Sequence, residues 1–102
     1  MFFNLDDDKN DSITFYAGEY LEVELIRNIS IMQVSIMSPL TGEIYREYIS
    51  NRDVDKFYKE NNLWRITIDT SWMEYSNYDL VIRSLDDSHI ELQKFITLSV
   101  RR

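Results

Sequence analysis

The chain has no cysteine among its 102 residues, only one proline and only two glycines. Without cysteine there is no disulfide to brace the fold and no thiol nucleophile, so a hydrophobic core must hold the structure unaided. The absence of thiols fits a reducing compartment. Because proline and glycine are so scarce, the sequence is neither a linker nor a low-complexity segment.

Positive charge is also in short supply. Eleven Lys and Arg stand against eighteen Asp and Glu, which gives a formal net charge of −7. A surface of this sign repels nucleic-acid phosphates and anionic membranes, so we expect neither as a partner. Two interpretations stay open: the charge serves solubility, or it attracts a basic partner.

A basic leader and a long apolar run are missing as well. The first residues, 1–6, are apolar and acidic in turn. This composition predicts neither a signal peptide nor a transmembrane helix. Together with the absence of cysteine, it leads us to expect a cytoplasmic protein, unless the chain belongs to a virus particle.

What the sequence does have is strict alternation of hydrophobic and polar residues between Ser12 and Val100. This pattern is typical of β-strands that bury one face. A short helical segment is expected within 54–60. Strands are expected at 12–16, 20–26, 31–37, 44–49, 63–69, 78–84 and 90–100. Seven strands, with no helix long enough for a parallel crossover, predict an all-β fold: an antiparallel β-sandwich of about seven strands.

The length of the chain predicts a single domain with a distinct beginning. Residues 1–11 combine apolar Phe2, Phe3 and Leu5 with a polar run, which predicts an N-terminal arm or a first short strand. Residues 12–102 form the sandwich domain. In its last strand Lys94 interrupts the inward-facing series, which predicts a bulge or a sheet edge nearby.

The end of the chain resembles immunoglobulin-like domains. The segment Tyr78-x-Leu80-x-Ile82 follows a short turn and is similar to the tyrosine corner, in which a tyrosine bonds back to the backbone a few residues upstream. The paired cysteines of antibody domains are absent, and Trp64 lies on the fifth expected strand. The chain therefore resembles the cysteine-free, immunoglobulin-like accessory domains of bacteriophages and bacterial multi-domain proteins.

This resemblance implies a non-enzymatic structural or interaction domain. We expect a phage-type accessory protein, such as a capsid decoration or virion-associated protein, docking on a capsid or other virion subunit. Its location would then be the virion. The alternative is a soluble acidic regulator or inhibitor that binds a basic protein surface, which Glu19, Glu22 and Glu24 support beside the acidic run 6–11.

Catalysis has little support in the sequence. The single histidine, His89, stands beside Asp86, Asp87 and Ser88 in an expected turn, where consecutive side chains diverge too much for a catalytic triad. No glycine-rich loop is present to hold a phosphate. We therefore predict that the protein is not an enzyme and has neither a cofactor nor a small-molecule substrate.

The acidic start of the chain is a candidate metal site. Asp6, Asp8 and Asn10 alternate as in the first half of a calcium loop, but Asp11 and Ala17 replace its glycine and its final glutamate. The expected state is a solvated acidic loop without metal. A weak calcium site shared with the turn at 86–87 stays open as the alternative.

Aromatic residues remain as candidates for partner binding. Phe2 and Phe3 either insert into a neighbouring subunit or pack under the first strand of this domain. Tyr45, Phe57 and Tyr58 either form an interface, where exposed tyrosine is favoured, or cover the open end of the sandwich.

Overall fold

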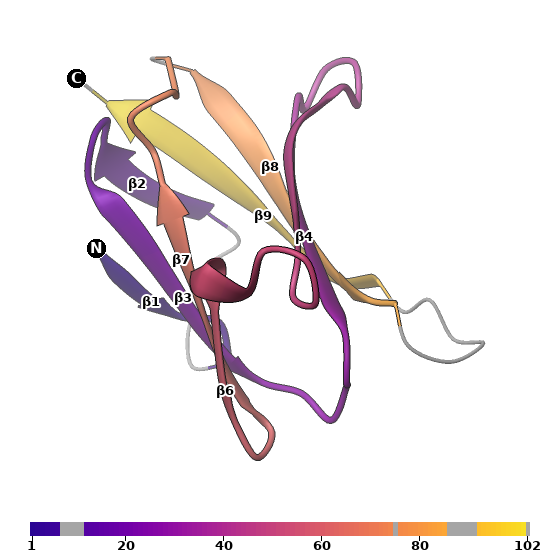
Figure 1. Cartoon of the computed structure of the whole chain (residues 1–102). Coiled ribbons are helices and arrows are strands. Elements are labelled where there is room, and N and C mark those ends of the chain that lie inside the picture. Colours follow the sequence, from indigo (N-terminus) through magenta and orange to yellow (C-terminus); the bar gives the residue numbers. More distant parts are fainter. Residues whose placement is uncertain (7–11, 75, 86–91, 102) are drawn as a thin grey trace.

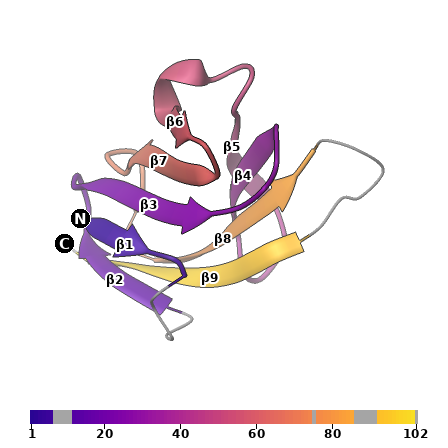
Figure 2. The same ribbon diagram turned by 90° about the horizontal axis from the view of Figure 1, so that it is seen from below.

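The computed structural model describes residues 1–6, 12–74, 76–85 and 92–101, the segment 92–96 through its backbone. These residues fold into two β-sheets that face each other (Figures 1 and 2). The elements are β1 (Phe2–Asn4), β2 (Ser12–Tyr16), β3 (Tyr20–Ile26), β4 (Met32–Met37), β5 (Ile44–Ile49), the 3-10 turn η1 (Val54–Lys56), β6 (Phe57–Glu60), β7 (Leu63–Asp69), β8 (Asn77–Ser84) and β9 (Leu92–Arg101). One sheet has the order β1-β3-β7-β6 and the other has the order β2-β9-β8-β4-β5. The prediction of an all-β fold is confirmed.

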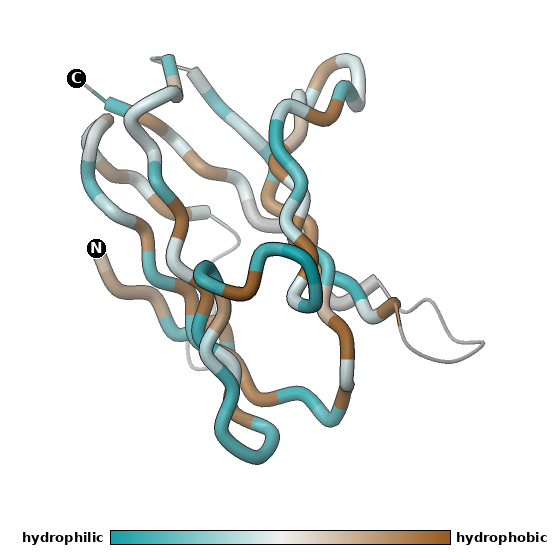
Figure 3. Tube along the Cα trace, in the orientation of Figure 1, coloured by the Kyte–Doolittle hydropathy of each residue, from teal (hydrophilic) through white to brown (hydrophobic). Residues whose placement is uncertain are grey.

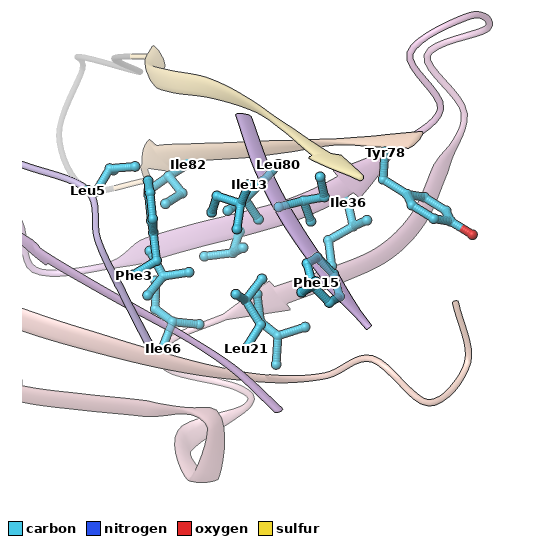
Figure 4. Packing of buried hydrophobic residues seen from close by; sticks show 14 of the residues in the cluster. Phe3, Leu5, Ile13, Phe15, Leu21, Ile36, Ile66, Tyr78, Leu80 and Ile82 are labelled. Atoms are coloured by element: carbon cyan, nitrogen blue, oxygen red, sulfur yellow. The ribbon is translucent and has the colours of Figure 1, made fainter. Parts of the chain in front are cut away.

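The core lies between the two sheets and follows from the alternation in the sequence. Along β3 and β7 hydrophobic and polar positions alternate (Figure 3), and every second side chain is buried. Trp64 is among these inward residues, as predicted, with only 2% of its surface exposed. Figure 4 shows side chains of both sheets meeting, among them Leu21 and Ile66 from one sheet and Ile36, Leu80 and Phe15 from the other.

The expectation of wholly antiparallel sheets is wrong at two places. Strand β1 runs parallel to β3, with Phe3 opposite Val23, and β2 runs parallel to β9, with Ile13 opposite Leu98. Parallel neighbours need a long connection, which is usually a helix. Here β2 of the opposite sheet connects β1 to β3, and strands of both sheets connect β2 to β9, so the lack of a long helix did not exclude parallel pairing.

Nine strands form among the residues described, two more than the seven expected. One is β1, in the segment expected as an N-terminal arm or a first short strand, and the other is β6, which lies where a short helical segment was expected. Only Val54–Lys56 is helical, as a 3-10 turn, and Phe57–Glu60 instead forms a hairpin with β7. Asn61 opens the hairpin loop with a φ of 56°, a left-handed conformation that asparagine tolerates better than most residues.

Two β-bulges interrupt the five-stranded sheet. In one, Lys94 lies opposite Ile82 and Leu92 lies opposite Arg83, so the strand holds an extra residue beside Lys94. This confirms the irregularity predicted there. The other bulge is in β5, where Arg46 lies opposite Ile36 but Ile44 lies opposite Met37.

Candidate functional site

The structure places the five predicted partner-binding aromatics in three different environments. Phe3 is buried in the core, whereas its neighbour Phe2 is 53% exposed, because successive residues of a strand face opposite sides. Phe57 packs edge-on against the core residue Trp64, while Tyr58 is 49% exposed. Tyr45 belongs to a third region, at the β5 bulge. The five residues therefore do not form one site.

Phe2 and Tyr58 share the outer face of the four-stranded sheet, which we call the acidic face. Strand register places Phe2 opposite Glu22, Tyr58 opposite Arg65, and Arg65 opposite Glu24. The face is defined by the outward side chains of β1, β3, β7 and β6, and its members used below are Phe2, Tyr20, Glu22, Glu24, Ile26, Tyr58, Glu60 and Arg65. Four of these are large apolar residues that are about half exposed or more: Phe2, Tyr20, Ile26 and Tyr58.

Charges on the acidic face are partly paired. The Arg65 guanidinium lies 2.9 Å from the Glu24 carboxylate and 5.8 Å from the centre of the Tyr58 ring. The hydrogen bond to Glu24 raises the pKa of Arg65. The Tyr58 hydroxyl donates to Glu60 over 2.8 Å, and this bond to a carboxylate raises the pKa of Tyr58. Among the named members, three carboxylates face one guanidinium, so the face is negative overall.

A second candidate region lies where the chain crosses from β7 to β8. Here a cavity of about 330 Å³, which we call the end cavity, is lined by Tyr45, Arg46, Trp72, Glu74, Ser76 and Tyr78. The crossing begins with a turn in which the Met73 amide donates to the Thr70 carbonyl over 3.0 Å. Met73 is itself buried in the core, which holds the crossing against the end of the sandwich.

Three aromatic rings build one side of the end cavity. The Tyr78 ring lies edge-to-face with Tyr45, with centroids 5.6 Å apart, and with Trp72, at 5.8 Å. Arg46 places its guanidinium 4.5 Å from the centre of the Trp72 ring and donates to the Tyr45 carbonyl over 2.9 Å. The bulge in β5 brings Tyr45 and Arg46 to this position, since bulges re-aim side chains.

Tyr78 is fixed by its hydroxyl. This group accepts a hydrogen bond from the Glu74 amide over 2.9 Å and donates to the Glu74 carbonyl over 3.4 Å. Figure 4 shows the ring at one end of the core with its oxygen directed away from the core. The predicted bond from this tyrosine to the backbone a few residues upstream is therefore confirmed.

A second cavity adjoins the end cavity at Ser76. It measures about 350 Å³, and we call it the polar cavity; it is lined by Ser76, Asn77, Ser99, Val100 and Arg101. The Ser99 hydroxyl donates to the side-chain oxygen of Asn77 over 2.9 Å. The Val100 amide donates to the Ser76 carbonyl over 3.0 Å. Hydroxyl, amide and guanidinium groups thus line this second space.

Most of the metal and catalytic candidates of the sequence fall outside the residues that the structure describes. These include His89 with the turn around it, and also Asp8 and Asn10. Asp6 is described, and its carboxylate accepts hydrogen bonds from the Ile26 amide and from Arg27, each over 2.6 Å. Within the described ranges, no group of three or more His, Cys, Asp and Glu residues is placed to hold a metal.

Sequence reasoning missed Arg46, Trp72 and Glu74 as neighbours of Tyr45. Their contact depends on a bulge and on a crossing between sheets, and neither leaves a periodic pattern in the sequence.

Comparison with protein-family models, with curated proteins and with solved structures finds no match to this chain. Across the part of the chain that is described, no helix has the length and apolar character needed to span a membrane.

Proposed function

We propose that this chain is an immunoglobulin-like, non-enzymatic interaction domain that docks on another protein through its acidic face. Two facing sheets and the bond from Tyr78 to Glu74 support the immunoglobulin-like assignment. The observation that carries the function is the exposure of Phe2, Tyr20 and Tyr58 on the outside of a regular sheet. Large apolar groups on one outer face favour a protein–protein contact.

Charge determines the kind of partner that suits this surface. Glu22 and Glu60 lie among the exposed aromatics, and the whole chain carries −7. A basic protein surface complements this face and is drawn to it at long range. A docked phage-type accessory protein and a soluble acidic regulator both use such a contact. They differ in whether the partner is a virion subunit or a free basic protein.

The face itself is tested by site-specific photo-crosslinking in the native source. A crosslinking residue at position 58 should give a defined adduct, whereas the same residue at Thr14, exposed on the opposite sheet, should not. Equal adducts from both positions, or none from position 58, would contradict the assignment of the acidic face.

The partner recovered in this way allows the energetics to be tested. Tyr58→Ala should weaken its binding about tenfold or more, the loss expected when an aromatic anchor is removed. Affinity should also fall as salt is added, because the contact is electrostatic. Binding that ignores both changes would refute docking through the acidic face.

A further inference from the structure

The end cavity and the polar cavity form a second, separate binding region. They share Ser76 and lie on elements other than those of the acidic face. Ligand pockets in proteins begin at about 300 Å³, so each cavity is large enough for one small group. We propose that the two cavities together bind an extended, proline-rich peptide segment, with a proline ring against the aromatic side of the end cavity and the backbone of the segment against the polar cavity.

The aromatic side of the end cavity suits a proline ring. Tyr45 is 38% exposed, and the buried Tyr78 supports it from behind. Tyr78 is in turn held by the Glu74 backbone, so the aromatic surface is set before any ligand arrives. Aromatic-lined grooves recognise proline-rich segments because these are already extended and lose little entropy on binding.

The polar groups of the two cavities suit the backbone of such a segment. Proline has a carbonyl acceptor but no N–H, so the backbone of a proline-rich ligand needs hydrogen-bond donors on the protein. Donors are present in the lining: the Arg46 guanidinium, the Ser76 hydroxyl and the Asn77 amide. Arg46 is also oriented in advance, by the Trp72 ring and the Tyr45 carbonyl.

Charge argues against an ionic ligand in the same place. A free cation meets Arg46, and a free anion meets the exposed Glu74 carboxylate and a chain of net charge −7. An uncharged peptide avoids both penalties. Oligosaccharides are also uncharged, and the hydroxyl and amide groups of the lining both donate and accept, so an oligosaccharide is the competing ligand in the test below.

The test is a titration of the ¹⁵N-labelled full chain, followed by amide chemical shifts. The probes are acetyl-hexaproline-amide, a Gly-Ser hexapeptide of equal length, cellobiose and sodium phosphate. Hexaproline should give saturable shifts at Tyr45, Arg46, Ser76 and Asn77. Shifts of these amides with the Gly-Ser peptide, cellobiose or phosphate but not with hexaproline, or no shifts at all, would overturn the proposal.

Matched variants separate this site from the acidic face and from unfolding. Tyr45→Ala should weaken hexaproline binding about tenfold or more, while Tyr45→Phe, which keeps the ring, should retain it. Tyr58→Ala on the acidic face should leave hexaproline binding unchanged. A spectrum that keeps its dispersion shows that each variant is folded. Equal binding by Tyr45→Ala and wild type would refute the site without bearing on the acidic face.

Discussion

Tyr78 joins the core of this protein to the chain segment that leads into β8. Tyr78 is buried, with 7% of its surface exposed, and its hydroxyl bonds to both the amide and the carbonyl of Glu74. The ring also packs edge-to-face with both Tyr45 and Trp72 in the end cavity. One side chain therefore contributes to stability and to the shape of a candidate site.

Tyr78→Phe isolates the hydroxyl from the ring. The Glu74 amide then loses its hydrogen-bond partner, so we expect the free energy of unfolding to fall by about 1–3 kcal/mol. Urea unfolding followed by circular dichroism measures this change. Tyr16→Phe, at an exposed position, serves as the control and should be neutral. A Tyr78→Phe variant as stable as its control would contradict a structural role for the bond.

Trp64→Ala removes the largest side chain on the inner side of β7. Trp64 packs against Phe57, and the Lys59 ammonium lies 4.9 Å from the centre of its ring. We expect a loss of about 3–5 kcal/mol in the free energy of unfolding, from lost burial and from the cavity left behind. Trp72→Ala, at a less buried position, should cost less. Thermal unfolding compares the two, and equal losses would show that Trp64 is not a core anchor.

Among the elements, β5 illustrates how an edge strand is protected. Within the described ranges its one neighbouring strand is β4, and no described strand pairs with the backbone groups of its other edge. The residues that follow it supply the bonds: Arg52 donates to the Glu47 carbonyl over 2.8 Å, and the Ile49 amide donates to Asp53 over 2.8 Å. Such bonds reduce the tendency of an edge to pair with another chain.

Acid should weaken this protection. The bond from the Ile49 backbone is the main cause that lowers the pKa of Asp53 from its ordinary 3.8, and the Ser71 backbone does the same for Asp69. A carboxyl whose pKa is lower in the folded state stabilises the fold above its ordinary pKa. That contribution is lost as the pH falls through the folded value.

The expected result is a melting temperature that falls as the pH drops below about 4, where ordinary carboxyls take up protons. Asp53→Asn should show a shallower fall, because one of the responsible groups no longer titrates. Thermal unfolding between pH 3 and 7 measures both slopes, with the scans repeated on Glu43→Gln, a distant exposed carboxyl, as control. Equal slopes for Asp53→Asn and wild type would remove Asp53 from the explanation.

The sequence predicted individual strands better than it predicted their neighbours. The bounds expected for 12–16, 20–26 and 63–69 are those observed, because alternation identifies a strand with one buried face. Alternation carries no information on which strand lies beside it, so both parallel pairings were missed. Strand β6 was missed because a segment as short as Phe57–Glu60 does not separate a period of 2 from one of 3.6.

The candidate sites were predictable to a similar, partial degree. Two adjacent residues of one strand must face opposite sides, so of Phe2 and Phe3, or of Phe57 and Tyr58, only one member was available for a partner. Which member faces out depends on the position of the core, and the sequence does not state this for such short strands. The surroundings of Tyr45 depend on the bulge in β5, which no local sequence pattern indicated.

For the whole molecule, the excess of negative charge should lower the stability of the fold and strengthen binding to a basic partner. With a net charge of −7, like charges repel one another across the folded surface. Raising the ionic strength to 0.15 M shortens the screening length to about 8 Å. We expect the melting temperature to rise by no more than about 4–8 °C, the shift that 1 kcal/mol causes in a domain of this size.

The same salt should weaken docking on a basic partner, since it screens attraction as well as repulsion. Parallel measurements of melting temperature and of partner affinity, over one series of sodium chloride concentrations, test this opposition. A melting temperature that instead falls with salt would show that local ion pairs, such as Arg65 with Glu24, outweigh the overall charge.

The pairing of β2 with β9 has a consequence for how the protein is made. Among the described residues, strand β2, Ser12–Tyr16, pairs only with residues 97–101, and β9 also pairs with β8. A nascent polypeptide therefore cannot close the larger sheet while it is still being translated through its middle. Until residues 97–101 have been synthesised, the edges of β2 and β8 that pair with β9 stay open to chaperones and to wrong pairing with other strands.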